Sequence, residues 1–518
     1  MSQDKSNITY ISEDYYRPHW TCGRYNAQKK VAIVFNLLSR MNYFFEAESA
    51  EVIDRVLTAG RGGNVNVTKI SDELGISENS IKIFFDELCN IGLLSKESIT
   101  DTIIDEYRTI CKSLETPPSI GAQRNENPTD VIQSAYHVFT NAVSDSTILT
   151  DVMFELTYCC QANCIHCYNP GAIRNKNEVN GRNKIEVLTL TDYKRIIDDL
   201  CANGLTSATI TGGDPFMYPF VWQIIEYLYQ NDIAISIYTN GIGLAGKEKR
   251  LAAYYPYKVQ CSLYSGNPDV HDRITTKKGS WMSTVSVMEN LHKYGVPIEI
   301  ACPIMQPNLK TYFGVKPYMR KFGSRLAFDV MLTDSIDGDK CVSHQLRLTP
   351  EQLSIVLLDE DVIQHINLDK ANETENDDLD FLNGAPCGVL KNSYCLNPNG
   401  DLTPCCAFHK ILGNLKHNTI TEVFNNNDFI KQWEKIKESD YGDCFKHEYC
   451  LYCYFCPGNN YNDKKECLNG GENNCYLAKV RYDTAMRYHG GEDLLHGKSI
   501  EERICELDIK HSSLHREY

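Results

Sequence analysis

The sequence predicts an α/β protein built around a partial (β/α)6 barrel of the TIM type. A winged-helix-like α+β domain precedes the barrel and a cysteine-rich domain follows it. Three observations support this prediction. From Asp151 to about Thr349, apolar strands alternate with amphipathic helical stretches, as in parallel sheets. Residues 1–100 show a hairpin pattern followed by three helical patterns. Ten of the 22 cysteines lie between Cys387 and Cys475.

Length and composition restrict the classes of function. A chain of 518 residues is too long for one ordinary core, so several domains are expected. We expect neither a membrane span nor a signal peptide, because the chain has no run of about 18 apolar residues and begins with a polar stretch. The formal charge of -16 argues against nucleic acid as a partner. The protein is therefore predicted to be cytoplasmic, with reduced cysteines that bind metal rather than form disulfides.

The N-terminal region predicts a small helix-turn-helix unit. Residues 29–47, KKVAIVFNLLSRMNYFFEA, alternate like a hairpin with a polar turn. A helix is predicted over residues 48–60, and two more follow within 66–97, separated by a turn at Gly75. The last helix carries one lysine and three acids in residues 77–92, which is the wrong charge for contacts with DNA phosphates.

The central region carries six predicted strands. They cover residues 151–157, 207–213, 234–240, 257–265, 297–305 and 326–333. The predicted domain boundaries are 1–100 for the N-terminal unit, 101–150 for a helical linker, 151–349 for the barrel, 350–383 for an acidic linker, 384–480 for the second cysteine-rich domain and 481–518 for a helical tail.

A cysteine motif follows the first predicted barrel strand. Cys160, Cys164 and Cys167 have the spacing C-x3-C-x2-C, at the strand end where such barrels gather their chemistry. Three thiolates on one loop can hold three irons of a [4Fe-4S] cluster and leave one iron open. Zinc would normally need a fourth protein ligand. The neighbouring Cys159 is predicted to point away, as a core residue.

This motif after a first barrel strand resembles the radical S-adenosylmethionine (SAM) enzymes, with His166 in the position that is usually aromatic. The resemblance implies that the open iron binds the amino and carboxylate groups of SAM, with His166 as a cofactor neighbour. It also implies that SAM is split into methionine and a 5′-deoxyadenosyl radical, which takes a hydrogen atom from a C–H bond.

Later strand ends extend this resemblance. The segment TITGGDPFMYP is similar to the GGE segment that binds the SAM amino group, so Gly212, Gly213 and Asp214 are expected there. Both glycines would let the backbone approach the ligand closely. Asn240 in YTNG and Ser262 in QCSLYS are expected to contact the ribose or the carboxylate. An H-D…G-S pattern, as in related enzymes, follows in VHDRITTKKGSW.

The second cysteine-rich region resembles the SPASM domain, which binds auxiliary [4Fe-4S] clusters in many radical SAM enzymes. Cys387 and Cys405 flank a hairpin turn, NPNGDL. The family's ligand pattern implies an inner cluster on Cys387, Cys405 and Cys456, with Cys395 as a possible fourth ligand or an open iron. It implies an outer cluster on Cys444, Cys453 and Cys475, with either Cys450 or His447 as a further ligand; Cys450 is favoured because thiolate is the usual ligand of iron–sulfur clusters. Cys406 and Cys467 have no place in the pattern, and a zinc-ribbon-like knuckle is the alternative.

The hairpin and three helices over residues 20–98 resemble the RiPP recognition element, which binds the leader of a ribosomally made, post-translationally modified peptide. In that family the leader adds a strand to the hairpin edge, here bordered by residues 43–46 and the third helix. The alternative is a packing domain without a ligand.

Together, the three resemblances predict a peptide maturase that installs thioether crosslinks, with an electron donor such as flavodoxin or ferredoxin. Carbon–carbon crosslinking and epimerisation are alternatives within this class. A zinc-binding winged-helix regulator is the alternative of another class.

Overall fold

The computed structural model describes most of the chain as two compact units. The described residues are 14–115, 150–169, 187–324, 328–336, 341–366, 387, 389–390, 393–433, 435–442, 444 and 446–509. One unit comprises residues 1–108 with 124–143, and the other comprises residues 109–123 with 144–518. Most of the predicted linker over 101–150 lies outside the described residues, although its start forms helix α4 (Asp101–Ser113).

The first unit contains an antiparallel sheet in the order β2-β3-β4. Its strands are β2 (Thr21–Asn26), β3 (Val31–Asn36) and β4 (Met41–Glu46). The predicted hairpin is confirmed, because β3 pairs with β4 from Val31↔Glu46 to Asn36↔Met41. Strand β2 was not predicted, since TCGRYN lacks a clear apolar alternation. A separate two-residue pair joins β1 (Tyr15–Tyr16) to β5 (Asn64–Val65).

Three helices complete this unit, as the sequence predicts. They are α1 (Ala47–Thr58), α2 (Val67–Leu74) and α3 (Glu78–Asn90). Gly75 ends α2 with a left-handed φ of 69°, which a glycine adopts without the Cβ penalty. The Ser77 side chain then caps α3 by accepting a hydrogen bond from the Ser80 amide. Ile53, Phe85 and Leu88 form part of the buried core.

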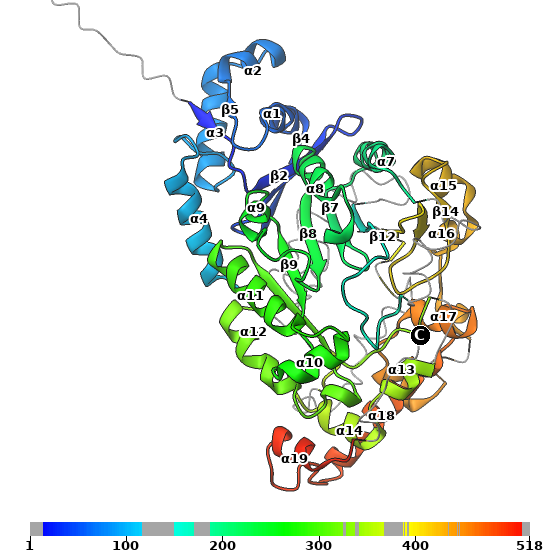
Figure 1. The fold of residues 1–518 in the computed structure, drawn as a ribbon. Helices are drawn as coiled ribbons and strands as arrows, with labels where there is room; N and C mark the ends of the chain where they lie inside the picture. Colours follow the sequence, from blue (N-terminus) through cyan, green and yellow to red (C-terminus); the bar gives the residue numbers. More distant parts are fainter. Residues whose placement is uncertain are drawn as a thin grey trace, which may run out of the picture. The chain divides into compact units, whose positions relative to one another are not determined.

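The second unit contains a sheet of nine strands in the order β11-β10-β9-β8-β7-β6-β12-β13-β14. The strands are β6 (Asp151–Glu155), β7 (Ser207–Thr211), β8 (Ala234–Thr239), β9 (Lys258–Ser262), β10 (Ile298–Pro303), β11 (Phe328–Asp329), β12 (Ser393–Leu396), β13 (Asp401–Thr403) and β14 (Gly413–Asn414). Strands β6 to β11 are parallel to their neighbours, which confirms the partial α/β barrel (Figure 1).

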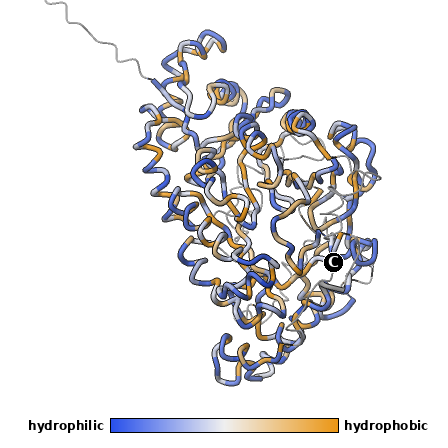
Figure 2. The backbone as a smooth tube through the Cα atoms, viewed as in Figure 1, coloured by the Kyte–Doolittle hydropathy of each residue, from blue (hydrophilic) through white to orange (hydrophobic). Residues whose placement is uncertain are grey.

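Helices cover the outer side of the barrel strands and connect them (Figure 1). The long ones are α7 (Leu190–Ala202), α8 (Val221–Gln230), α10 (Pro268–Thr275) and α11 (Ser280–Lys293). The shorter ones are α9 (Glu248–Ala252), α12 (Lys316–Phe322), α13 (Cys341–Leu346) and α14 (Pro350–Val356). Figure 2 shows hydrophobic colour along the barrel strands and alternating colours along the helices, as a buried sheet under amphipathic helices requires.

The cysteine-rich region joins the barrel sheet instead of forming a separate unit. Strand β12 pairs in parallel with β6, from Ser393↔Asp151 to Leu396↔Phe154. The predicted NPNGDL hairpin is the connection from β12 to β13. The helices of this region are α15 (Ile420–Asn426), α16 (Asp428–Trp433), α17 (Pro457–Lys464), α18 (Glu472–His489) and α19 (Ile500–Glu506).

Two predicted connecting segments differ from the structure. The predicted linker over 350–383 begins with α14, where Leu353 and Val356 are buried because LSIV presents an apolar face to the core. Farther along, the buried Asp359 accepts hydrogen bonds from the Tyr312 hydroxyl at 2.9 Å and from Lys316 at 2.7 Å. Residues 367–383 lie outside the described part. Helix α18 also crosses the boundary predicted at residue 480.

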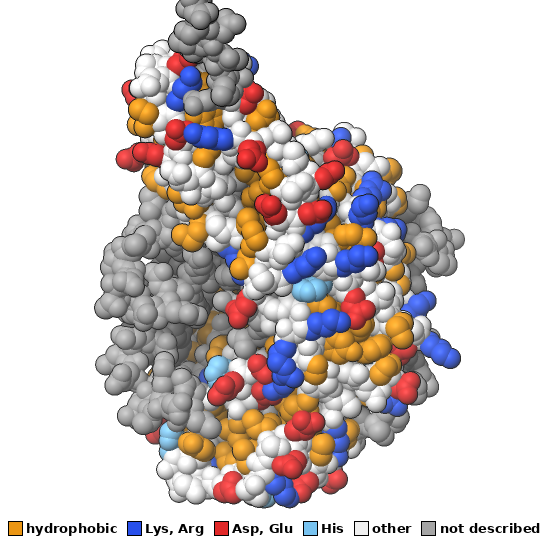
Figure 3. All heavy atoms as spheres, turned by 90° about the vertical axis from the view of Figure 1, so that its left-hand side faces the viewer, with side chains coloured by type: hydrophobic (Ala, Val, Ile, Leu, Met, Phe, Trp, Pro, Cys, Tyr) orange, Lys and Arg blue, Asp and Glu red, His pale blue; other side chains and the backbone are white. Residues whose placement is uncertain are grey.

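None of the helices in the described residues is long and apolar enough to cross a membrane. Acidic and basic side chains are interspersed over the face drawn in Figure 3, on a chain with a formal charge of -16.

Candidate functional site

The loop after β6 carries the first cysteine motif and lies against the end of β7. The Gly213 amide donates to the Thr157 carbonyl at 2.6 Å, and the Asp214 amide donates to the Cys159 carbonyl at 2.9 Å. A Cβ on Gly213 would lie 2.3 Å from that same Cys159 oxygen, and one on Gly212 would lie 2.3 Å from the Thr157 oxygen. The sequence predicted that these glycines admit a ligand. In the structure they admit the cysteine loop.

The same loop is held on its other side by α10. Asn163 and Ile165 donate their amides to the carbonyls of Thr275 at 2.9 Å and Ile274 at 3.0 Å. The H-D…G-S segment builds this support, because Asp272 accepts hydrogen bonds from the Gly279 and Trp281 amides at the start of α11. This segment therefore positions the loop from behind.

Asp214 is fully buried, and its carboxylate has several protein partners. It accepts hydrogen bonds from the Thr239 hydroxyl at 2.6 Å, the Asn240 amide at 3.1 Å and the Phe216 amide at 3.1 Å. Burial raises the pKa of Asp214, and these hydrogen bonds oppose the shift. The side chain thus ties the end of β7 to the end of β8, while its predicted contact with SAM stays a prediction.

Two of the motif cysteines have polar neighbours on other barrel strands. The Asn240 side-chain amide donates to Cys160 Sγ at 3.2 Å and to the Gln161 side chain at 3.3 Å. The Tyr264 side chain, just after β9, belongs to an apolar cluster against which Cys164 packs, and burial raises the pKa of Tyr264 well above its usual range. Asn240, predicted as a SAM contact, therefore borders the cysteine loop, and Ser262, the other predicted contact, acts on the pKa of Tyr264 beside that loop.

The three motif thiols are gathered around these neighbours. Cys160, Cys164 and Cys167 are half-buried, and Cys164 and Cys167 both act electrostatically on the Tyr264 hydroxyl. His166 packs edge-on against the Tyr264 ring, with centroids 4.7 Å apart. Cys159 was predicted to be a core residue but is half-buried, and its carbonyl accepts a hydrogen bond from the Asp214 amide.

A second group of thiols lies between the hairpin of β12 and β13 and the start of α17. We call it the inner group, with the members Cys387, Cys395, Cys405, Cys406 and Cys456. Burial raises the pKa of Cys405 first, and Cys406, Cys456 and Cys387 then raise it further. Cys406, which the predicted pattern did not place, and the fully buried Cys395 both interact electrostatically with Cys405, while the predicted choice between Cys395 and an open iron stays a prediction.

A third group, the outer group, has the members Cys444, Cys450, Cys453 and Cys475. Burial raises the pKa of Cys453, and Cys475, Cys450 and Cys444 each raise it further. A Cβ on Gly470 would lie 2.7 Å from Cys475 Sγ and 3.3 Å from Cys444 Sγ, so these two sulfurs flank one glycine. Between the two open alternatives, the structure brings Cys450 into the group, whereas the His447 ring stacks on Tyr449 at 5.0 Å.

The remaining candidates are placed apart from these groups. Cys467 interacts electrostatically with Lys410 and Glu466. The 21 cysteines whose side chains are described form no disulfides with one another. Among the described side chains, no three histidines, cysteines or carboxylates are placed to hold a single metal ion.

Comparisons with protein families match both cysteine-rich regions. Residues 154–308 match the Radical SAM superfamily, and residues 387–457 match SPASM, an iron-sulfur cluster-binding domain. The chain is a radical SAM enzyme with a SPASM domain. Its cofactors are [4Fe-4S] clusters and SAM.

Several characterised proteins are similar to this radical SAM enzyme. The subtilosin biosynthesis protein AlbA of Bacillus subtilis is 25% identical over 351 residues, which cover 64% of this chain and 74% of AlbA. The mycofactocin maturase MftC of Mycolicibacterium smegmatis is 30% identical over 143 residues, 27% of this chain and 34% of MftC. The crystal structure of Streptococcus suis SuiB bound to its precursor peptide SuiA shares the fold, with a TM-score of 0.52 at 12% identity over 89% of this chain and 99% of SuiB.

The thiols of this radical SAM enzyme suit iron–sulfur clusters. Protein N–H and O–H groups that donate to cysteine sulfur, as Asn240 does to Cys160, are an ordinary means of tuning a cluster. The inner and outer groups each crowd at least four thiols, and burial together with their mutual repulsion raises the pKa of most of them. Loading metal on such thiols releases protons and relieves that repulsion.

A buried acid beside the cysteine loop was not predicted from the sequence. Glu155, the last residue of β6, is 2% exposed and accepts a hydrogen bond from the Tyr168 hydroxyl at 2.5 Å. Burial raises its pKa to about 7, and the Tyr168 hydrogen bond opposes this shift. Its position at an otherwise apolar strand end, in FELT, is the signal that could have identified it.

Proposed function

We propose that this radical SAM enzyme modifies a ribosomally made precursor peptide and installs thioether crosslinks between a cysteine sulfur and a carbon atom. The observation that carries the peptide substrate is the open edge of strand β4 in the first unit. Relatives named for subtilosin biosynthesis and mycofactocin maturation support the same class of substrate.

Strand β4 suits the addition of a peptide strand. It lies at the edge of the β2-β3-β4 sheet, and most of its residues are half-buried or exposed. The rings of Phe45 on β4 and Phe84 on α3 meet edge-on, with centroids 6.1 Å apart. An extended leader would pair its backbone with the strand edge and place alternate side chains toward these rings.

The three thiol groups would hold three clusters. Cys160, Cys164 and Cys167 would hold the SAM-binding cluster. The inner cluster would take Cys387, Cys405 and Cys456 together with Cys395 or Cys406, and the outer cluster would take Cys444, Cys450, Cys453 and Cys475. The strand ends that carry Gly213, Asn240 and Ser262 would form the SAM site, with His166 beside it.

When bound, these cofactors supply a 5′-deoxyadenosyl radical and an acceptor for one electron. The peptide would lose one hydrogen as an atom from a C–H bond and one as a proton from a cysteine thiol. A sulfur–carbon bond forms, and one electron remains for the acceptor. The protein residues hold the two reacting groups together and keep water away from them.

The barrel cysteines offer little support for epimerisation, which needs a hydrogen donor that reaches the peptide. Cys261 and Cys302 lie on barrel strands, but they are 0% and 1% exposed within the main core. Burial raises the pKa of Cys261 to about 12, as expected for a packed thiol.

Co-expression tests this function. The full chain would be produced with a short cysteine-rich peptide encoded beside it, and the peptide would be analysed by mass spectrometry. We expect a loss of two hydrogens per crosslink, with one cysteine thiol blocked for each. An unchanged mass with one deuterium from solvent would indicate epimerisation instead. Two hydrogens lost with all thiols still free would indicate a carbon–carbon crosslink.

A metal analysis tests the alternative of a zinc regulator. Anaerobically prepared protein should be brown and carry about twelve irons, as three four-iron clusters require. A colourless protein that carries zinc would overturn the proposed function.

A further inference from the structure

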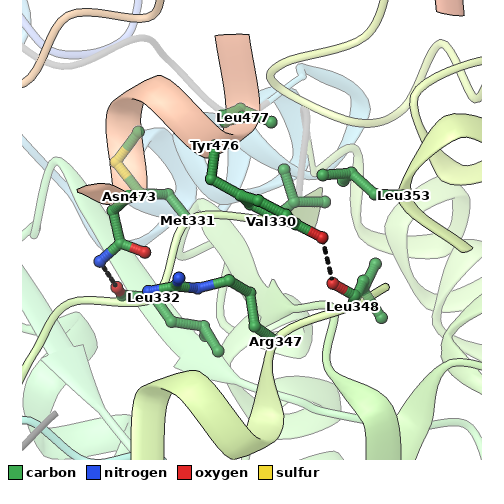
Figure 4. A pocket seen from close by; sticks show the side chains of 9 residues that line it. All are labelled: Val330, Met331, Leu332, Arg347, Leu348, Leu353, Asn473, Tyr476 and Leu477. Carbon is green, nitrogen blue, oxygen red and sulfur yellow. Dashed lines mark hydrogen bonds between the residues drawn. The ribbon is translucent and has the colours of Figure 1, made fainter. Parts of the chain in front are cut away.

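Acids already compensate the arginine in the pocket where β11, α14 and α18 meet (Figure 4). Arg347 Nη1 lies 3.8 Å from Glu472 Oε1. Burial lowers the pKa of Arg347, and Asp334, Glu472 and Asp463 oppose this shift. The exposed cations around the barrel loop differ from this arginine, because they have no such acidic partners.

Six exposed cations lie in two segments that follow strands β8 and β9. We call them the basic rim, with the members Lys247, Lys249, Arg250, Arg273, Lys277 and Lys278. None of the six forms an ion pair with a residue that the structure describes. The whole chain carries 68 acids and 52 lysines and arginines, so an unpaired basic surface is an exception to its overall charge.

The few acids in and around these segments leave the rim positive. Residues 247–250 and 269–278 contain three acids. Glu248 is buried, and Asp272 accepts hydrogen bonds from amides at the start of α11. Asp269 is the one exposed acid of the three, at the first turn of α10. No acid occurs in the neighbouring stretches 159–169, 215–225 and 280–288.

The segment after β9 holds its cations beside the loop of the barrel cysteines. The hydroxyl of Thr276, the residue before Lys277, donates to the Asn163 carbonyl at 2.9 Å. Asn163 directly precedes Cys164 in the sequence. The cations of this segment therefore border the cysteine loop.

The segment after β8 reaches the same loop. The Lys247 ammonium donates to the Gly243 carbonyl at 2.7 Å, and a Cβ on Gly243 would lie 2.5 Å from Gln161 Nε2. Asn240, at the start of this segment, donates to Cys160 Sγ at 3.2 Å. Both segments thus border the proposed site of the SAM-binding cluster.

The first turn of α11 connects the two segments and adds an exposed apolar side chain. The turn follows Lys278, and the Thr284 hydroxyl donates to the Asn240 carbonyl at 2.7 Å. Met282 in this turn is 65% exposed. An apolar contact with charged residues around it is the common composition of a protein interface, so the rim suits a protein partner.

We propose that the basic rim is the docking surface for a small, acidic electron-carrier protein. Each cleavage of SAM consumes one electron, which another molecule must deliver to the cluster behind the rim. The carrier is oxidised by one electron, and the sulfur–C5′ bond of SAM breaks to give methionine and the 5′-deoxyadenosyl radical. Opposite charges would steer the carrier to this surface, and weak electron-transfer complexes need only small interfaces. The proposal is independent of which peptide the enzyme modifies.

A binding titration on the full chain tests the surface without turnover. The probe is oxidised flavodoxin, a small acidic carrier. Lys249→Glu combined with Lys278→Glu changes one exposed lysine in each segment. We expect this rim variant to bind flavodoxin about tenfold or more weakly at low salt, because attraction becomes repulsion.

A matched control makes the same change of charge away from the rim. Lys293→Glu combined with Arg320→Glu alters exposed side chains at the far end of α11 and on α12. This control should weaken binding less than about twofold, since charges beyond a Debye length are screened. Equal losses in the two double variants, or a rim variant that binds like the natural chain, would overturn the proposal.

Salt dependence gives a second readout of the same complex. Binding to the natural chain should weaken as salt rises from about 50 to about 200 mM, because ions screen the opposite charges. The rim variant should lose most of this dependence. The same salt dependence in both proteins would contradict docking at the rim.

SAM cleavage then connects the surface with electron transfer. 5′-Deoxyadenosine is measured without peptide, first with photoreduced flavodoxin and then with dithionite, a small reductant that needs no docking surface. The rim variant should be about tenfold slower with flavodoxin and should keep the natural rate with dithionite. An equal loss with both reductants would refute the proposal, because the lysines would then support the cluster itself.

A second rim variant, Lys247→Glu combined with Lys277→Glu, repeats these measurements in case the first does not fold. A rim variant that loses affinity for a precursor peptide but not for flavodoxin would show a peptide site instead and would also refute the proposal. No peptide is present in the other measurements, so docking can fail while thioether formation stands, and the reverse.

Discussion

The barrel loop and the outer group are both built from closely spaced cysteines, yet their surroundings differ. The barrel loop offers three thiols, with the neutral polar side chains of Asn240 and Tyr264 beside them. The outer group gathers four thiols, and its charged neighbours are three cations, Arg481 beside Cys453 and Lys464 and Lys479 beside Cys475, and one acid, Asp463.

This difference indicates how one fold holds clusters for two tasks. Four thiolates carry one more negative charge than three, and nearby cations offset that charge. Three thiolates leave an iron free for a ligand, and neutral donors can adjust the cluster without competing for that position. In the proposed assignment, cysteine number and neighbouring charge would therefore distinguish the SAM-binding cluster from the outer one.

The largest expected effect comes from breaking the three-thiol loop. Cys164→Ala should abolish reductive cleavage of SAM and lower the iron content from about twelve to about eight per chain. Cys159→Ala is the matched control, since the Cys159 carbonyl and not its thiol holds the loop. Iron analysis and chromatography of 5′-deoxyadenosine measure both results. Equal loss in the two variants would contradict the assignment.

The second largest expected effect tests whether the fourth ligand of the outer cluster is the Cys450 thiol or the His447 ring. Cys450→Ala should remove about four irons per chain, because a cluster that loses a thiolate at a four-thiol site is poorly held. His447→Ala should leave the iron content unchanged, since its ring stacks on Tyr449. If the histidine variant loses the iron and the cysteine variant keeps it, the two roles are reversed.

The next expected effect concerns the buried acid Glu155 beside the barrel loop and is measured as the pH dependence of stability. The folded-state pKa of Glu155 is about 7, above its ordinary value of 4.5, so the folded state binds the proton more tightly. Protonated Glu155 therefore stabilises the folded state below pH 4.5. This contribution to the free energy of unfolding, about 3 kcal/mol, is lost as the pH rises to about 7. Glu155→Gln should remove this loss.

Urea unfolding of anaerobic protein at pH 5 and pH 8 measures that difference. The exposed Glu226→Gln is the matched control and should keep the pH dependence of the natural chain. If Glu155→Gln and the natural chain show the same pH dependence of stability, the pKa of Glu155 is not raised in the folded protein.

The smallest expected effect concerns the neutral polar side chains beside the barrel cysteines. Tyr264→Phe removes a hydroxyl that lies close enough to Cys164 for this thiol to raise the pKa of Tyr264, and donors near cluster sulfur stabilise the reduced cluster. The midpoint potential of the SAM-binding cluster should fall by about 20 to 60 mV, the equivalent of one net hydrogen bond. Electron paramagnetic resonance titration measures the shift, and the auxiliary clusters in the same sample serve as the control. A shift confined to them would contradict the contact.

Local sequence patterns predicted most of the fold and the cysteine motif, but not the side chains at other strand ends that lie beside the cysteine loop. Strands such as AISIYT are recognisable because every residue is apolar or small. The strand β11 is harder to recognise from the sequence, because it is short and only Phe328–Asp329 pair with β10. Tyr264 and Glu155 were missed because one tyrosine or glutamate at a strand end has no spacing that marks it. Ligand chemistry already favoured Cys450 over His447 in the sequence, and the structure adds that Cys450 acts electrostatically on Cys475.

The sequence by itself determined the order of the elements, the barrel class and the three-cysteine loop, because these depend on periodicity and spacing within short stretches. Tertiary structure alone decided that β12 extends the barrel sheet beside β6, and that Gly212 and Gly213 make room for the cysteine loop. It also decided that the cations of residues 247–250 and 273–278 lie beside the same cysteine loop. Each of these depends on contacts between residues far apart in the chain, which local patterns do not encode.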